Sequence, residues 1–124
     1  VSGARLIGFT LTNGATATNG TSAQDMCGGG VYCSAAASVL SNCIIVGNAG
    51  YGDNPNGSGG GGAYNGTYFN CAILGNRIVQ RGGGGTFNCI LSNCVVAGNR
   101  YTARLGLSGA SSDGMAAMAA VADG

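Results

Sequence analysis

Charged side chains are scarce in this 124-residue chain, which has no Lys, no Glu and no His, and only five Arg and four Asp. A formal net charge of +1 provides neither a basic patch for nucleic acid nor a polybasic membrane anchor. No apolar run approaches the roughly 20 residues that a membrane-spanning helix needs. We therefore expect no nucleic-acid partner and no membrane insertion. So few charges also leave little repulsion between copies of the chain, which favours self-association.

Groups for acid–base catalysis are equally few. Besides the C-terminus, the carboxylates are Asp25, Asp53, Asp113 and Asp123. Glycoside hydrolysis typically requires two carboxylates that face each other across the scissile bond, and the chain has no Lys or His to serve as another base. A metal site is not expected either, because no Cys-x-x-Cys pair is present. The sequence predicts a protein that is not an enzyme and has no cofactor or metal.

Other features favour an extracellular location. The chain begins at Val1 without Met, as a processed mature chain or an excerpt would. It contains six Cys and three formal glycosylation acceptors, Asn19-Gly20-Thr21, Asn56-Gly57-Ser58 and Asn65-Gly66-Thr67. We expect a secreted or cell-surface protein.

The most informative feature of the chain is a repeat. One phrase, Asn-Cys-x-x-x-Gly-Asn, occurs at residues 42–48, 70–76 and 93–99, with a degenerate earlier copy at 8–14. A second phrase, Gly-Gly-Gly-x-Tyr or Gly-Gly-Gly-x-Phe, precedes the full copies within residues 28–33, 60–65 and 83–88. Constant phrases separated by insertions of variable length are typical of a solenoid whose loops protrude from its sides.

The strands of this repeat are short, rich in β-branched and aromatic residues, and bounded by Gly and Asn. We predict an all-β fold, a right-handed parallel β-helix of three to four short coils. The coils are expected near residues 5–14, 28–48, 60–76 and 83–99. Residues 1–99 would form the β-helix, and residues 100–124 a tail that caps it or contacts another subunit. Strands stacked in register about 4.8 Å apart place equivalent residues in ladders along the axis.

The phrase Gly-Gly-Gly-x-Tyr followed by Asn-Cys-x-Ile-x-Gly-Asn resembles the repeats of right-handed parallel β-helix proteins of bacterial surfaces. Polymorphic outer-membrane proteins and autotransporter-like adhesins carry similar phrases, and the resemblance covers roughly residues 3–99. It implies the same fold. For function it implies less, because this fold hosts adhesins, polysaccharide enzymes and structural proteins alike.

Side chains alternate along the recurring strand, which assigns its residues to two faces. The predicted interior set is Phe9, Cys43, Cys71 and Cys94, followed two positions later by Leu11, Ile45, Ile73 and Val96. The opposite face carries an apolar set that we call the assembly stripe: Ile44, Val46, Ala72, Leu74, Val95 and Ala97. An exposed apolar surface that spans several coils is normally a contact surface, so we expect the stripe to meet another chain or the protein's own tail.

Asn and aromatic residues also recur at equivalent positions of the three full copies of the repeat. Two Asn ladders are expected, one from Asn42, Asn70 and Asn93 and one from Asn48, Asn76 and Asn99. Asn suits a ladder because its side chain bonds a neighbouring backbone or the next Asn, and because it tolerates the left-handed turn conformation. An aromatic ladder is expected on a second wall, facing either inward or outward, from Tyr32, Tyr64 and Phe87.

The six cysteines divide into two groups. We interpret Cys43, Cys71 and Cys94 as small apolar residues of a reduced interior ladder, because in-register side chains rarely present the dihedral angle of a disulfide. The other three, Cys27, Cys33 and Cys89, lie outside this ladder. The pair Cys27 and Cys33 is the disulfide candidate to test first.

The tail contains the one stretch whose composition favours a helix, Gly114–Ala122, with Met115, Met118 and Val121 as its apolar positions. A helix of this length is marginal in water by itself. If ordered, it is expected to pack on the last coil, on the assembly stripe or on a neighbouring subunit.

Three functions remain open. We hypothesise a structural subunit of an extracellular self-assembling filament or surface layer, built from stacked β-helices, whose partners are copies of itself joined head to tail or laterally. The alternative is a repeat segment of a larger cell-surface adhesin or autotransporter passenger. The third is a polysaccharide-binding or polysaccharide-degrading β-helix protein, which would bring a glycan contact.

Overall fold

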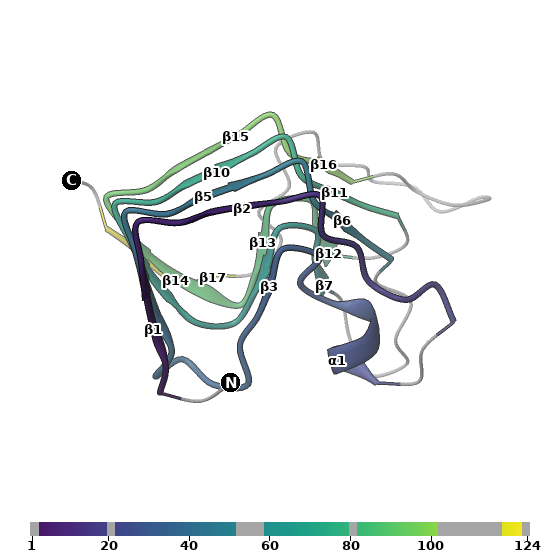
Figure 1. Cartoon of the computed structure of the whole chain (residues 1–124), viewed down its shortest axis with the longest axis horizontal. Coiled ribbons are helices and arrows are strands. Elements are labelled where there is room, and N and C mark those ends of the chain that lie inside the picture. The colour runs from purple at the N-terminus through teal and green to yellow at the C-terminus, as the bar shows by residue number, and fades with distance from the viewer. Residues whose placement is uncertain (1–2, 20–21, 52–58, 80–81, 102–117, 123–124) are drawn as a thin grey trace.

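The structure is a computed structural model that describes residues 3–19, 22–51, 59–79, 82–101 and 118–122. It is an all-β parallel solenoid, in which short strands of successive coils lie side by side and form parallel sheets (Figure 1). The predicted fold class, a parallel β-helix, is confirmed.

Four coils make up the described solenoid. The first contributes β1 (Arg5–Ile7) and β2 (Thr10–Thr12). The second contains β3 (Val31–Tyr32), β4 (Val39–Ser41), β5 (Ile44–Val46) and β6 (Ala49–Gly50). The third contains β7 (Gly59–Gly60), β8 (Ala63–Tyr64), β9 (Thr67–Phe69), β10 (Ala72–Leu74) and β11 (Arg77–Ile78). The fourth contains β12 (Gly82–Gly83), β13 (Thr86–Phe87), β14 (Cys89–Ser92), β15 (Val95–Ala97) and β16 (Arg100–Tyr101).

One turn of helix, α1 (Ala23–Met26), lies between the first and second coils. It projects from the side of the stacked strands (Figure 1). No helix among the described residues has the length and apolar character to cross a membrane.

Two sheets carry most of the packing. The stripe sheet has the order β2-β5-β10-β15, and the tail sheet has the order β1-β4-β9-β14-β17, where β17 is Met118–Ala122. Within the stripe sheet the register partners are Thr10, Ile44, Ala72 and Val95. Phe9, Cys43, Cys71 and Cys94 each lie one residue earlier, so they occupy equivalent positions.

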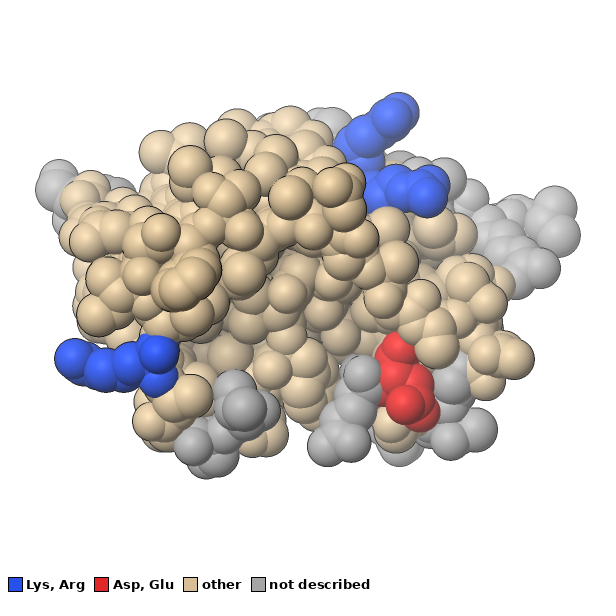
Figure 2. All heavy atoms as spheres, viewed as in Figure 1, with Lys and Arg blue, Asp and Glu red and all other residues tan. Residues whose placement is uncertain are grey.

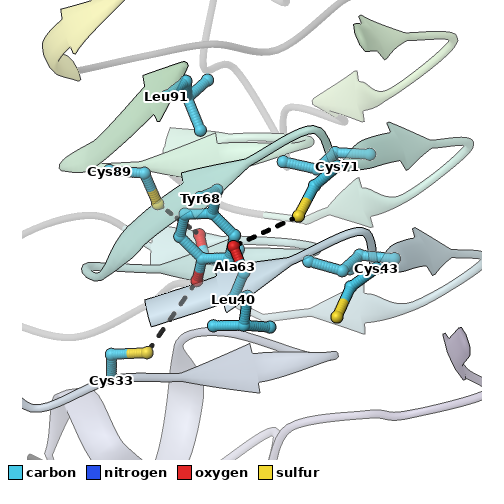
Figure 3. Close-up of a cluster of buried hydrophobic side chains, with 10 residues drawn as sticks. Cys33, Leu40, Cys43, Ala63, Tyr68, Cys71, Cys89 and Leu91 are labelled. Atoms are coloured by element: carbon cyan, nitrogen blue, oxygen red, sulfur yellow. Dashed lines mark hydrogen bonds between the residues drawn. The ribbon is translucent and has the colours of Figure 1, made fainter. Parts of the chain in front are cut away.

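The core fills the space enclosed by the coils. Its large side chains with no exposed surface include Tyr68, Ile45 and Ile73. Leu91 and Leu40 are also buried beside Tyr68 (Figure 3). Full burial of an apolar side chain of this size contributes about 1.5 to 3 kcal/mol relative to exposure. The coils are therefore held together by apolar burial as well as by strand pairing.

The glycine runs lie where the backbones of two walls nearly touch. A Cβ atom at Gly61 would lie 2.1 Å from the carbonyl oxygen of Arg77 and 2.3 Å from that of Gly84. Gly29 and Gly84, which occupy the same position in the neighbouring coils, are equally confined by backbone atoms. The repeated Gly-Gly-Gly phrase is therefore required by space, because any side chain would force the walls apart.

The tail differs from its expected conformation. Residues Met118–Ala122 form the strand β17, which pairs in parallel with β14, so the helix expected over Gly114–Ala122 is wrong for this part. The outer edge of β14 offers a row of backbone partners, and these outweigh the weak preference of a short segment for helix. Residues 114–117 of that expectation lie outside the described residues.

Candidate assembly surface

The assembly stripe forms the outer face of the stripe sheet. Ile44 is 43% exposed and Val95 is 59% exposed; Ala97 is also exposed, and Val46, Ala72 and Leu74 are partly exposed. The first coil presents exposed Thr10 and Thr12 on the same face. The surface is thus polar at its N-terminal coil and apolar over the next three coils.

The opposite face of the same strands points into the core. Ile45 and Ile73 are fully buried, and Leu11 and Val96 at the two ends pack against the same cluster. Alternation along each strand therefore places the stripe residues outward.

Phe9 is a correction to the expected interior set. Its side chain is 56% exposed, although Cys43 and Cys71 at the equivalent positions are buried. No described coil lies on the outer side of Phe9, whereas Cys43 and Cys71 each have a coil on both sides. A position that is enclosed inside a stack is open in the first coil.

A shallow groove runs along the corner between the tail sheet and the stripe sheet, with a volume of about 410 Å³. It is lined by Asn42, Cys43, Ile44, Asn70, Cys71, Ala72, Asn93 and Val95. The three Asn residues adopt left-handed backbone conformations with φ of +52°, and Asn93 Nδ2 donates a hydrogen bond to Asn70 Oδ1. This exposed Asn ladder makes the corner at which each coil passes from one sheet to the other.

Further exposed apolar side chains lie on the tail sheet. Ile7 and Phe69 are both exposed and occupy one ladder, separated by Ser41. These residues immediately precede the corner of the groove in the sequence. The exposed Asn ladder at the corner therefore separates these apolar side chains from the assembly stripe.

The second Asn ladder, Asn48, Asn76 and Asn99, is buried. Asn76 Oδ1 accepts hydrogen bonds from the backbone N–H of Asn48 at 2.9 Å and from Asn48 Nδ2 at 3.0 Å. Asn76 Nδ2 donates to Ile45 O at 2.8 Å and to Asn99 Oδ1 at 2.9 Å. The same bonding repeats in the next coil, where Asn99 Nδ2 donates to Ile73 O. This ladder joins coils through side-chain amides.

Among the described residues, no charged side chain belongs to the assembly stripe. On the face shown in Figure 2 the described charged side chains lie toward the margins, and the other described residues are uncharged. Arg77 and Arg100 are register partners on the sheet formed by β6, β11 and β16. Asp25 accepts a hydrogen bond from Ser22 Oγ at 2.9 Å beside α1. The other three Asp residues lie outside the described residues.

None of the six cysteines, all of which lie among the described residues, forms a disulfide, so the candidate disulfide between Cys27 and Cys33 is a further correction. The two thiols belong to different surroundings. Cys27 packs against Gly59, where a Cβ atom would lie 2.7 Å from the sulfur, whereas Cys33 Sγ lies 3.9 Å from Tyr68 Oη inside the core. The short spacing of these cysteines in the sequence does not bring their sulfur atoms together.

Cys43, Cys71 and Cys94 form a ladder with a repeated bonding pattern. Cys71 Sγ donates to Leu40 O of the preceding coil at 3.5 Å and to Phe69 O of its own coil at 3.3 Å, and the other two thiols make the corresponding two contacts. A hydrogen bond from the Cys71 thiol lowers the pKa of Cys94 to about 6. The same hydrogen bond, together with burial, raises the pKa of Cys71. The partly exposed Cys94 is therefore the more acidic of the two thiols.

Tyr68 is a core residue that the sequence reasoning did not assign. Its side chain is fully buried, its hydroxyl lies near the thiols of Cys33 and Cys89, and burial raises the pKa of Tyr68 well above its usual value (Figure 3). Its ladder consists of Leu6, Leu40, Tyr68 and Leu91. The available signal was a large apolar residue three positions before each of Phe9, Cys43, Cys71 and Cys94.

The aromatic residues Tyr32, Tyr64 and Phe87 stack along the axis. Their ring centroids are 5.1 Å and 5.8 Å apart, with nearly parallel planes. The rings are partly exposed, whereas Ala63, next to Tyr64, belongs to the core cluster. The aromatic ladder therefore lies on the outer side of its wall.

Within the part of the chain that the structure describes, no three Cys or Asp side chains come together as a metal site would require. In comparisons with known proteins, no family model, curated protein or solved structure matches this chain. The surface features are therefore the basis for a functional proposal.

Proposed function

We propose that this chain is a structural segment of an extracellular self-assembling filament or surface layer, in which β-helices associate through the assembly stripe. The observation that carries the proposal is the exposure of Ile44 and Val95 on a sheet face that is apolar over three coils. Burial of apolar surface contributes about 25 cal/mol per Å², and a contiguous exposed patch of this kind marks a contact site. Copies of the same chain carry the same patch and are its proposed partners.

Strand edges support association along the axis as well. Phe9 O accepts from Ile44 N, so the backbone groups of Phe9 and Leu11 face β5 and those of Thr10 and Thr12 face the outer edge. That edge of β2, and the outer edge of β15, have no partner strand among the described residues. Unpaired edges invite pairing with another chain, and a head-to-tail contact between copies need not close.

A repeat segment of a surface adhesin is the second candidate. The same free edges of β2 and β15 fit further coils of a longer solenoid equally well. The repeated phrases, which resemble those of polymorphic outer-membrane proteins and autotransporter adhesins, favour this candidate. In that case the assembly stripe would face another part of the passenger or a neighbouring molecule.

The stripe is tested by two matched double variants. Ile44→Lys with Val95→Lys places charges on the outer face of β5 and β15, while Ser41→Lys with Ser92→Lys places them on the tail sheet in the same two coils. Sedimentation velocity should show that the stripe variant loses association at micromolar concentration and that the tail-sheet variant retains it. Equal loss in both, or in neither, would remove the stripe as the interface.

A further inference from the structure

The strand β17 occupies a position that belongs to the repeat. It pairs with β14 on the side away from β9, as a strand of a fifth coil would. The register of the tail sheet gives one ladder, Leu6, Leu40, Tyr68, Leu91 and Val121. Val121 thus occupies the position that follows Leu91 in this ladder.

Backbone hydrogen bonds define the free edge at the other end of this sheet. Ala4 O accepts from Val39 N, and Gly8 N donates to Ser41 O, so the even-numbered residues of this segment bond to β4. The peptide groups of Arg5 and Ile7 therefore face outward, where the described residues provide no neighbouring strand. The chain thus presents β1 as an edge that can pair with a strand of another copy.

The outer edge of β14 presents backbone groups that can pair with the outer edge of β1. Ile90 N donates to Gly66 O, and Asn70 N donates to Ser92 O, so Ile90 and Ser92 bond to β9. The peptide groups of Leu91 then face β17. If a second copy stacks on the last coil with the same parallel register as successive coils, its β1 pairs with β14. Its Leu6 then occupies the position opposite Leu91 that Val121 occupies in the single chain.

We propose that β17 is an exchangeable cap, which competes with β1 of a second copy for the outer edge of β14. This inference rests on the proposed self-assembly and adds a control to it. End-to-end joining then requires β17 to leave its edge. The chain regulates its own assembly with its C-terminal segment.

Two observations make β17 the weaker of the two competitors. Its pairing with β14 has a register shift between Cys89 and Ile90, whereas the β1–β4 and β4–β9 pairs have none. Its sequence, Met-Ala-Ala-Val-Ala, is rich in Ala, which is depleted in strands. A conflict between local preference and observed conformation marks a segment that is held loosely.

A second copy also offers more pairing than the cap. The strand β17 covers one sheet, whereas an incoming first coil would bring β2 as well, and the continued register pairs Thr10 with Val95. The exchange therefore replaces one irregular strand pair with two regular ones.

The test compares the full chain with a variant that lacks residues 102–124 and with two proline variants of the full chain. In a parallel pair Leu91 bonds the residues on either side of Val121, so Ala122→Pro removes a donor to β14. Val121→Pro is the matched control, because its N–H faces away from β14. The readouts are the concentration at which polymers form, measured by light scattering, and amide exchange at Leu91.

If β17 is paired with β14 in nine chains out of ten, its removal strengthens end-to-end assembly about tenfold. We expect this shift for the truncated chain and for Ala122→Pro, together with faster exchange at Leu91 in their monomers, while Val121→Pro stays close to the full chain. Assembly of all four proteins at one concentration would overturn the cap and leave the proposed function intact. Failure of all four to assemble would contradict the proposed function as well.

Discussion

The two Asn ladders use one residue type for different physical purposes. Asn48, Asn76 and Asn99 are buried, and their amides supply the hydrogen bonds that join successive coils. Asn42, Asn70 and Asn93 are exposed and adopt φ of +52°, so their main contribution is a backbone conformation that few residues tolerate. The two Asn ladders recur in the same way in the sequence but stabilise the fold by different means.

Breaking the buried ladder should have the largest effect. Asn76→Leu removes the acceptor of the Asn48 amide and the donor to Ile45 O, and leaves these groups buried without partners. Because each such group costs about 1 to 3 kcal/mol, we expect a loss of about 3 kcal/mol or more in the free energy of unfolding. Urea denaturation measures it. A stable, cooperatively unfolding Asn76→Leu protein would show that the buried amides are dispensable.

Crowding the buried ladder should have the next largest effect. In Gly62→Ala the new Cβ atom would lie 2.8 Å from Asn76 Cγ and 2.8 Å from Gly85 O. We expect a cost of about 1 to 3 kcal/mol. Gly75→Ala is the control: its Cβ meets nothing within 4 Å, and its φ of +59° alone costs about 1 kcal/mol. If thermal unfolding shows Gly62→Ala to be the milder change, close packing above the ladder is not important.

At the exposed Asn ladder, stability should depend on how readily a residue adopts the left-handed backbone conformation. Asn70→Gly keeps the left-handed conformation available, so we expect a change within about 0.5 kcal/mol. Asn70→Val forces a β-branched residue to the same φ and should cost about 1 to 2 kcal/mol. Chemical denaturation of the pair measures the difference. Equal stability of the two variants would mean that the amide, and not the backbone, matters at this corner.

The cysteine ladder extends the comparison to its own exposed end. Cys94 is partly exposed with a pKa lowered to about 6, whereas Cys43 and Cys71 are buried. Because the folded pKa lies below the ordinary value of 9.0, the stabilisation from Cys94 is present above that value and is lost as pH falls through about 6. Iodoacetamide should label Cys94 first, with half of its maximal rate near pH 6. Faster labelling of Cys43 would reverse the assigned order.

The repeat predicted the features that recur in every coil. Alignment of the repeated phrases predicted the register of the stripe sheet, because parallel in-register stacking leaves no freedom once the strands are aligned. It could not distinguish the buried Asn76 from the exposed Asn70, because both recur with the same spacing. Only the position of the glycine wall over Asn76 decides between them.

The ends of the solenoid escaped prediction for a related reason. Phe9 occupies a cysteine position of the repeat, but no described coil covers it. In the tail, local composition favoured a helix, while the edge of β14 selected a strand. Both errors arise where a neighbouring coil is present on one side only. There the position of a residue in the repeat no longer predicts its burial or its conformation.

The inner ladders hold the coils together, and we propose that the outer stripe joins copies of the chain. Multi-angle light scattering of the purified full chain across a range of micromolar concentrations tests it most directly. If the stripe joins copies of the chain, the mean molar mass rises with concentration above the 12.0 kDa of one chain. A folded species that remains at 12.0 kDa throughout the range would contradict it.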